Sequence, residues 1–426
     1  MRRIWELPQE LKLFLKISAV LWGICLACEL FCRFLLHAPS GMTRGNFPYT
    51  WPVLWFNHWR DFWCWIPRFS HLHTLRFFSP KASLDQPFTY PPAMALLFEG
   101  FYVCPHPIRC FLIVTTAAIG IFAWGFYLAM RRTGLAWAPA AAFLLMACLM
   151  SYPFWFEFDL ANMEIWVWIF VASGVWAFLR DKPYLAAVLF AVAGSAKLFP
   201  FVFFALFLTR RKYGPILLGG AVAAVLSVGG LWMMYPNLRI AINGVKAGMG
   251  FFRSDYLLRM RYETGFDHSI FGFMKRVAAE GFGATIPDLT RMNSIYLPVI
   301  ACIGVFLYFR YIRRLPINNQ VLALTIASIL FCPTSHDYTL MHLYVPWALL
   351  VLLAIRARGT ASIPGLKVAF ICMAIAMSAE TEIIRRGIPL GGQIKCLALV
   401  VLFVIALRFP FSEETPAKTE RVVLMA

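Results

Sequence analysis

The sequence predicts an all-α membrane protein that crosses the bilayer many times. Hydrophobic residues make up 61% of its 426 residues and charged residues only 14%, whereas an average soluble protein has about 25% charged residues. Apolar runs of about 17–25 residues, long enough to span a bilayer, recur along the whole chain. No linker or low-complexity stretch divides them, so we expect one integral-membrane domain over residues 1–411 and a disordered tail over 412–426.

Basic residues between the apolar runs orient the chain, because such residues usually lie in cytoplasmic loops. They occur at Arg131-Arg132, Arg180/Lys182, Arg210-Arg211-Lys212, Arg310/Arg313-Arg314 and Arg356/Arg358. The predicted spans are 13–36, 107–130, 136–152, 160–179, 183–208, 214–235, 293–312, 318–333, 340–356, 363–379 and 391–409. Both termini and the tail then lie in the cytoplasm. The basic pair Arg385-Arg386 is an exception to the charge rule, because it falls on the opposite side. The net charge is +18, but no basic cluster lies within a soluble domain. This argues against nucleic acid as a partner and in favour of membrane lipids.

Segment 183–208 has basic residues at both ends, so both of its ends should lie on one side of the membrane. Its centre contains Gly194, Lys197 and Pro200, which predicts two short helices that enter the membrane and return. Counting this hairpin as two helices gives about twelve spans. Lys197 either faces a cavity and has a functional role, or its side chain extends along the hairpin so that its charge reaches water.

Segments 37–106, 151–159, 236–292, 334–339 and 380–390 then form the outer face. The polar residues best suited to chemistry fall in these segments: Asp61, Glu157, Asp159, Asp267, His268, His336 and Asp337. The long segment 236–292 reads either as an acceptor-side lid or as a charged loop in water.

The first outer segment is predicted to hold two helices lying in the membrane interface. Tryptophan recurs every four residues from 51 to 63, which on a helix gives one apolar stripe, and Pro67 would end that helix. Asp61 and Arg60 lie on its polar face, where Asp61 either acts in chemistry or simply pairs with Arg60. Tyr90-Pro91-Pro92 begins a second helix, about 91–103, which is too short to span.

Two side-chain pairs invite other chemistry. His336 and His342 are expected on different elements, so we do not expect them to share a metal ion. No metal and no cofactor are predicted for the site. Cys64 and Cys104 lie in the same outer segment and could form a disulfide there.

Several short motifs occur in a fixed order along the chain. They are Asp61-Phe62, Phe88-Thr89-Tyr90-Pro91-Pro92, Asn162 preceded by Asp159-Leu160, Lys197-Leu198-Phe199-Pro200 followed by Arg210-Arg211-Lys212, His268-Ser269-Ile270 followed by Lys275-Arg276, and Cys332-Pro333-Thr334-Ser335-His336. In this order the chain resembles the bacterial polyprenol-phosphate-mannose-dependent mannosyltransferases of glycosyltransferase family 87, which have the GT-C fold. Asp159 and Leu160 stand where that family usually has Gly and Gln.

The resemblance implies a hexosyltransferase of the bacterial inner membrane. It would move a sugar, mannose in the first instance, from a polyprenyl phosphate to a lipid or glycan acceptor of the cell envelope on the periplasmic face, with inversion at the donor carbon. Asp61 is the expected general base, because a nearby carboxylate can take the proton of an acceptor hydroxyl. Asp159 is the second candidate for that role.

The remaining site residues are expected to bind substrate. The phosphate that leaves needs positive charge around it, for which Lys275, Arg276 and His336 are candidates and Lys197 a more distant one. Residues expected to contact the sugar or the lipid headgroup are Glu157, Asn162, His268, Tyr90 and Arg60.

Two other classes of protein share parts of this pattern. A polyprenyl-lipid flippase or transporter would have internal repeats and charges distributed through its spans. An O-antigen ligase or polymerase would place its working residues in a late outer loop. The oligomeric state and the acceptor are not predicted.

Overall fold

The structure, a computed structural model, describes residues 6–30, 59–82, 86–259, 267–358, 363–378, 384–385 and 388–412. These residues are almost entirely helical, as predicted. The exception is a small antiparallel hairpin of β1 (Ile384–Arg385) and β2 (Ile388–Pro389). The predicted tail, apart from its first residue, lies outside the described residues.

The α-helices are α1 (Gln9–Leu30), α2 (Arg60–Trp65), α3 (Pro92–Tyr102), α4 (Pro107–Arg132), α5 (Trp137–Leu149), α6 (Tyr152–Leu160), α7 (Glu164–Leu179), α8 (Pro183–Ala196), α9 (Ala205–Thr209), α10 (Tyr213–Met234), α11 (Leu238–Phe251), α12 (Ile270–Gly281), α13 (Ile286–Arg310), α14 (Ile317–Leu330), α15 (Tyr344–Arg356), α16 (Leu366–Ala376) and α17 (Gly391–Arg408). Short 3-10 helices lie at Ile66–His71, Leu75–Phe78, Pro80–Ala82, Phe199–Phe204, Ile312–Arg314 and Asp337–Leu343, and a π-helix lies at Phe252–Arg259.

Among the described residues, five helices are long and apolar enough to cross a membrane: Pro107–Arg132, Tyr213–Met234, Ile286–Arg314, Asp337–Arg356 and Gly391–Arg408. A sixth span would combine α5 and α6, which are bent by 55° relative to each other. The chain is therefore a multi-pass membrane protein, but twelve spans are not supported. Several predicted spans, such as α7 and α16, are apolar helices of only 16 and 11 residues, shorter than the roughly 20 residues that a single span needs.

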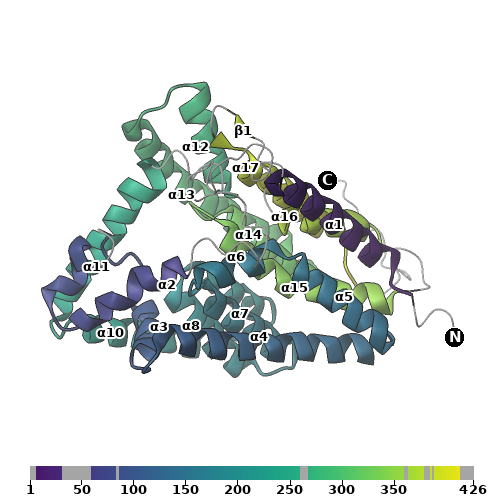
Figure 1. Ribbon diagram of the computed structural model, residues 1–426, viewed down its shortest axis with the longest axis horizontal. Helices are drawn as coiled ribbons and strands as arrows, with labels where there is room; N and C mark the ends of the chain where they lie inside the picture. Colours follow the sequence, from purple (N-terminus) through teal and green to yellow (C-terminus); the bar gives the residue numbers. More distant parts are fainter. Residues whose placement is uncertain are drawn as a thin grey trace.

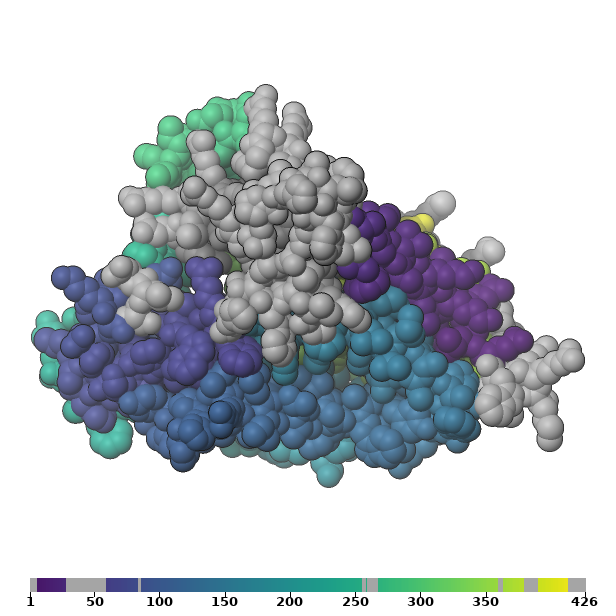
Figure 2. All heavy atoms as spheres, viewed as in Figure 1, coloured from purple at the N-terminus to yellow at the C-terminus, as the bar shows by residue number. Residues whose placement is uncertain are grey.

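The helices form a bundle with a triangular outline (Figure 1). α4 lies along one edge, α1 packs on α16 and α17 packs on both α16 and α14 along a second, and α11, α12 and α13 form the third. α8 packs between α7 and α10. In the space-filling view, α1 lies along the purple upper right flank, and the blue segments that include α4 form the lower band (Figure 2).

The helical hairpin predicted from residues 183–208 is confirmed. α8 ends at Ala196, the chain turns at Lys197 and Leu198, and helical structure resumes at Phe199 and continues to the end of α9. The two arms lie side by side, because the ring of Phe190 packs on those of Phe203 and Phe207 at centroid distances of 5.4 and 6.0 Å. Lys197 therefore lies at the tip of a hairpin rather than in the middle of a span.

The helix predicted from the tryptophan repeat at 51–63 is confirmed only at its C-terminal end, Arg60–Trp65, and is interrupted at Trp59. α2 contains only six residues, and Trp59 before it has left-handed backbone angles, φ 62° and ψ 38°. A right-handed helix cannot continue back through such a residue. The α-helix ends at Trp65, just before Pro67, as predicted, and Pro67 occupies the first turn of the 3-10 helix Ile66–His71 that follows. Trp51 and Trp55 lie outside the described residues.

A buried arginine organises the segment that follows α2. The side chain of Arg68 is fully buried and donates hydrogen bonds to the carbonyl oxygens of Phe77, Ser79 and Gln86, at 3.0 Å for Ser79. Its guanidinium also lies 5.8 Å from the centroid of the Trp65 ring. Burial lowers the pKa of Arg68 to about 10, which leaves the group charged at neutral pH. The segment therefore folds around one cation.

The predicted short helix at 91–103 is confirmed as α3, and two glycines fix its start. A Cβ atom at Gly230 of α10 would overlap the carbonyl group of Pro92, and one at Gly248 of α11 would overlap the carbonyl oxygen of Phe88. Only glycine allows this close approach of helix and backbone. The segment that carries Tyr90 is therefore held directly against α10 and α11.

Two predicted boundaries differ because of local capping. α13 begins at Ile286 instead of 293, where the backbone N–H of Thr285 donates to Oδ2 of Asp288 at 2.9 Å. Segment 236–292 thus contains α11, the π-helix and α12. α7 begins at Glu164 instead of 160, because left-handed Ala161 ends α6 and the side chain of Asn162 accepts the N–H of Glu164 at 2.9 Å.

Candidate active site

The structure brings Asp61 and Asn162 together from segments that are far apart in the sequence. Nδ2 of Asn162 donates to Oδ2 of Asp61 at 2.6 Å, and the N–H of Trp59 donates to the carbonyl oxygen of Asp159 at 2.8 Å. Trp59 and Ala161, which precede Asp61 and Asn162, both have left-handed backbone angles. Such conformations cost roughly 1–2 kcal/mol in residues other than glycine and concentrate at functional sites.

Glu164 connects this pair to a lysine and a histidine. Its side chain is fully buried; Oε1 lies 2.7 Å from Nε2 of His342, and Oε2 forms an ion pair with Nζ of Lys197. Nζ of Lys197 also lies 4.7 Å from the ring centroid of Tyr338 and 5.8 Å from that of Tyr90. The tip of the hairpin therefore places a cation within the site.

Tyr90 and Glu157 complete this group. The ring of Tyr90 packs on Trp65 at 5.3 Å. Burial, together with the nearby carboxylates of Asp61, Glu164 and Glu157, raises the pKa of Tyr90 well above its usual value, so its hydroxyl remains a donor. Glu157 is buried, and neither of its carboxylate oxygens has a hydrogen-bond partner of normal geometry in the described part of the chain. We call these residues the Asp61 cluster: Asp61, Tyr90, Glu157, Asn162, Glu164, Lys197 and His342.

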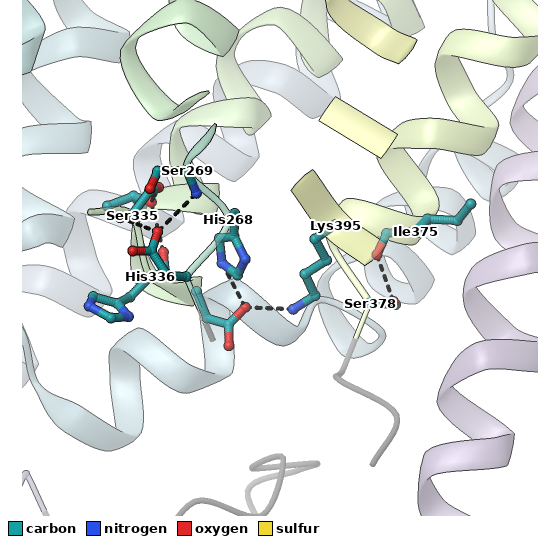
Figure 3. Close-up of polar contacts among 10 residues, drawn as sticks. His268, Ser269, Ser335, His336, Ile375, Ser378 and Lys395 are labelled. Atoms are coloured by element: carbon teal, nitrogen blue, oxygen red, sulfur yellow. Dashed lines mark hydrogen bonds and ion pairs between the residues drawn. The ribbon is translucent and has the colours of Figure 1, made fainter. Parts of the chain in front are cut away.

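A second buried group is centred on Asp337. Its Oδ1 atom lies 2.5 Å from Nζ of Lys395 and 3.1 Å from Nε2 of His268. The side chains of His268 and Lys395 converge on this oxygen (Figure 3). Nζ of Lys395 also lies 4.8 Å from the ring centroid of Tyr152. Burial lowers the pKa of His268, although the neighbouring Asp337 opposes this effect.

Asp267 fixes the position of that group. Its Oδ1 atom accepts the backbone N–H groups of Ser269 and Ser335, each at 2.9 Å, and the N–H of His268 donates to the carbonyl oxygen of Ser335 at 2.8 Å. These bonds attach the start of α12 to the segment after α14. We call Asp267, His268, Ser335, Asp337 and Lys395 the Asp337 cluster.

The two clusters lie at opposite ends of the same two helices. α6 begins with Tyr152, beside Lys395, and contains Glu157 near its other end. The 3-10 helix Asp337–Leu343 begins with Asp337 and carries His342 one residue before its end. A change in either helix would therefore affect both clusters.

Other predicted site residues lie outside the Asp61 cluster. His336 lies with its Nε2 atom 3.1 Å from Oγ1 of Thr334 and turns away from His268 (Figure 3). Arg276 is buried, with Nη1 donating to Oε1 of Gln393 at 2.6 Å and Nε 3.1 Å from Oε1 of Glu280. Its neighbour Lys275 is buried on the same helix, whereas Arg60 is exposed.

The sequence interpretation missed Glu164, His342 and Lys395 as site residues. A signal existed for Glu164 and Lys395, because both are ionisable residues within apolar runs, where such residues are rare and usually functional. Within the ranges that the structure describes, no group of three or more His, Cys, Asp or Glu side chains could hold a metal ion. Cys104 lies against Cys110 and not against Cys64.

The fold and the site define a multi-pass membrane protein with a buried acid–base cluster where the segment after α1 meets the bundle. Residues 88–335, more than half of the chain, match Glycosyltransferase family 87, and the chain belongs to that family. It is therefore a membrane glycosyltransferase, which requires a sugar donor and an acceptor. The curated proteins and the solved structures compared with the chain gave no match. Asp61, His336 and Lys395 lie outside the matched residues.

Proposed function

We propose that the protein transfers a hexose, mannose in the first instance, from a polyprenyl phosphate to a lipid or glycan acceptor of the cell envelope. The reaction would take place on the periplasmic face of a bacterial inner membrane. The observation that carries this proposal is the hydrogen bond of 2.6 Å between Asn162 and Asp61, beside the Glu164–Lys197 ion pair. Together these contacts give the site an oriented carboxylate, Asp61, and a cation, Lys197, and sugar transfer from a lipid phosphate would use both.

Asp61 would act as the general base. As the acceptor oxygen forms its bond to the anomeric carbon of the donor, the carboxylate would take the hydroxyl proton. The bond between that carbon and the phosphate oxygen would break, and its electron pair would leave with the polyprenyl phosphate. Attack on the face opposite the phosphate would invert the anomeric configuration. The hydrogen bond from Asn162 supports this role because it fixes the orientation of the carboxylate.

The departing phosphate would be stabilised by positive charge and hydrogen-bond donors. Lys197 is the first candidate, because it lies among Glu164, Tyr90 and Tyr338. His336, Lys275, Arg276 and His268 would act only if the donor also extends toward the Asp337 cluster. A phosphate that is already a stable anion needs no general acid. We further propose that Lys197 supplies the positive charge that a metal ion would otherwise provide, so the reaction should proceed in excess EDTA.

The sugar would be bound by the remaining polar groups of the Asp61 cluster and its neighbours. Glu157 is suited to this role, because its carboxylate is buried and a ligand could supply further hydrogen-bond donors to it. Asp159, the second candidate base, and the hydroxyl of Tyr90 would contact the sugar or the acceptor. Arg60, which is exposed one residue before Asp61, would meet the lipid headgroup.

The test uses purified protein and labelled polyprenyl-phosphate-mannose. Asp61→Asn should reduce transfer by about 10²–10⁴-fold, the range of general-base catalysis, while thermal stability changes little. The matched control is Asp181→Asn: the Asp181 side chain is 76% exposed and pairs with Arg210 on the surface, so this change should leave transfer intact. An Asp61→Asn protein that transfers sugar at the normal rate would exclude Asp61 as the base.

A further inference from the structure

We propose that Cys104 and Cys110 form a disulfide that joins the end of α3 to the start of α4. The two Sγ atoms lie 2.9 Å apart. Cys104 lies two residues after the end of α3, and Cys110 lies in the first turn of α4, so the pair closes the corner between these two helices. A disulfide brings its sulfurs to about 2.05 Å, so the thiols would need to approach by less than about 1 Å. The sequence left a pair of Cys104 with Cys64 open, and the geometry favours Cys110 as the partner of Cys104 instead.

The backbone already holds the two thiols together. Pro105 and Pro107 between them restrict the chain, the N–H of Cys110 donates to the carbonyl oxygen of His106 at 2.9 Å, and that of Cys104 donates to Phe101 at 3.1 Å. Closing the bond would therefore order little additional chain.

Packing behind the corner keeps it in place. The ring of Phe101 lies 5.2 Å from that of Phe111 and 5.5 Å from that of Trp166, measured between centroids. These contacts attach the corner to α4 and α7. The approach of Cys104 to Cys110 thus belongs to a packed part of the bundle.

Cys64 is poorly suited to compete for either thiol. Burial, and to a smaller extent the charge of Asp61, raise its pKa to about 11. Because the thiolate is the reactive form of cysteine, Cys64 would react slowly at neutral pH.

The reaction requires an oxidant, which would be a thiol oxidoreductase that carries its own disulfide. The thiolate of one cysteine would attack that disulfide, form a mixed disulfide with the oxidant and release the first of its two thiols. The other cysteine would then attack the mixed disulfide and release the second thiol of the oxidant. One S–S bond forms and one breaks, so two electrons and two protons pass to the oxidant. Disulfides of this kind persist in oxidising compartments such as the periplasm. A stable Cys104–Cys110 bond would therefore place the corner between α3 and α4 on the oxidising side, where we propose that Asp61 acts.

Peptide mapping of the full-length protein tests the inference without any activity assay. Membranes are quenched in acid, free thiols are alkylated, and the protein is digested with trypsin without reduction. Arg109 lies between the two cysteines, so trypsin separates them, and a disulfide would appear as a linked pair of peptides that reductant splits.

The wild-type protein should give this linked pair as its main form. Cys64→Ser should keep the pair, whereas Cys110→Ser should lose it and leave Cys104 alkylated. Recovery of both cysteines as alkylated thiols from the wild type would overturn the proposal, as would a link from Cys104 to Cys64. The wild-type map decides the question even if Cys110→Ser fails to fold. Neither result depends on sugar transfer.

Discussion

The Asp61 cluster and the Asp337 cluster contain similar residues, but their lysines differ in exposure to solvent. In the Asp337 cluster one carboxylate oxygen meets both Lys395 and His268, and all three side chains are at most 3% exposed. In the Asp61 cluster the side chain of Lys197 is 16% exposed. A buried network of paired charges makes a structure rigid, whereas a charge that reaches solvent can meet a ligand. We therefore propose that the Asp337 cluster supports the architecture and the Asp61 cluster the chemistry.

The largest effect is expected from Lys395→Met, which leaves Asp337 buried with only His268 beside it. Breaking a buried ion pair on one side costs about 3–5 kcal/mol of stability. Thermal unfolding of the purified protein in detergent should show a clear fall in Tm, which Asp337→Asn added to Lys395→Met should partly restore. Lys367→Met, at an exposed position of α16, is the control. A stable but inactive Lys395→Met protein would instead indicate that the Asp337 cluster takes part in the reaction.

Lys197→Met should have the opposite profile. Removing one group that stabilises developing negative charge costs about 10²–10³-fold in kcat. Stability should fall less than for Lys395→Met, because His342 remains bonded to Glu164. Turnover and Tm of the same preparation separate the two effects, and Lys182→Met, exposed at the base of the same hairpin, provides the control. Normal turnover combined with a large loss of Tm would make Lys197 architectural.

Asn162→Ala should reduce turnover by about tenfold to a hundredfold. A hydrogen bond to a charged group contributes about 1.5–3 kcal/mol, which corresponds to a change of this size. The variant loses the donor to Asp61 and the acceptor for the N–H of Glu164. Steady-state kinetics should show the loss in kcat more than in KM. Asn243→Ala, at an exposed position of α11, should behave like the wild type; an equal loss in both variants would remove the special role of Asn162.

The smallest effect is expected from two adjacent glycines of α10. Gly230→Ala would push α10 away from the start of α3, at an expected cost of about 1–3 kcal/mol, typical of overpacking. Gly229→Ala meets open space and should stabilise the helix by up to about 1 kcal/mol. Chemical or thermal unfolding of both variants checks the difference. Equal stabilities would show that the contact of Gly230 with Pro92 does not fix the position of Tyr90.

The helices were predictable where apolar composition alone decides them. The predicted segments at 107–130, 214–235 and 391–409 agree closely with α4, α10 and α17. The number of spans was not predictable, because a short apolar helix such as α7 can be buried within the bundle instead of crossing a membrane alone. The helix predicted from the tryptophan repeat is interrupted at Trp59 for another reason. The backbone N–H of Trp59 donates a hydrogen bond to Asp159, a hundred residues away, and local tryptophan spacing cannot reveal so distant a contact.

The candidate site was predictable only where a residue stands out from its local sequence. Asp61, Asn162 and Lys197 stand out in the sequence as polar residues beside prolines, tryptophans or apolar runs, and the structure brings them together. Glu164 and His342 meet across 178 residues, a pairing that no local pattern encodes. Lys395 stands out in the sequence as an ionisable residue within an apolar run, but its partner Asp337, 58 residues away, becomes evident only in the structure.

The buried Arg68 has a consequence for how this enzyme could diversify. Its acceptors at Phe77, Ser79 and Gln86 all belong to the segment between Asp61 and Tyr90, and the ring of Trp65 meets those of Phe88 and Tyr90 edge to face. This segment therefore has polar and aromatic contacts of its own, in addition to those that hold it against α10 and α11. Under the proposed function, a substitution at an exposed position of the segment leaves these contacts in place, so acceptor preference can change without moving Asp61 and Tyr90.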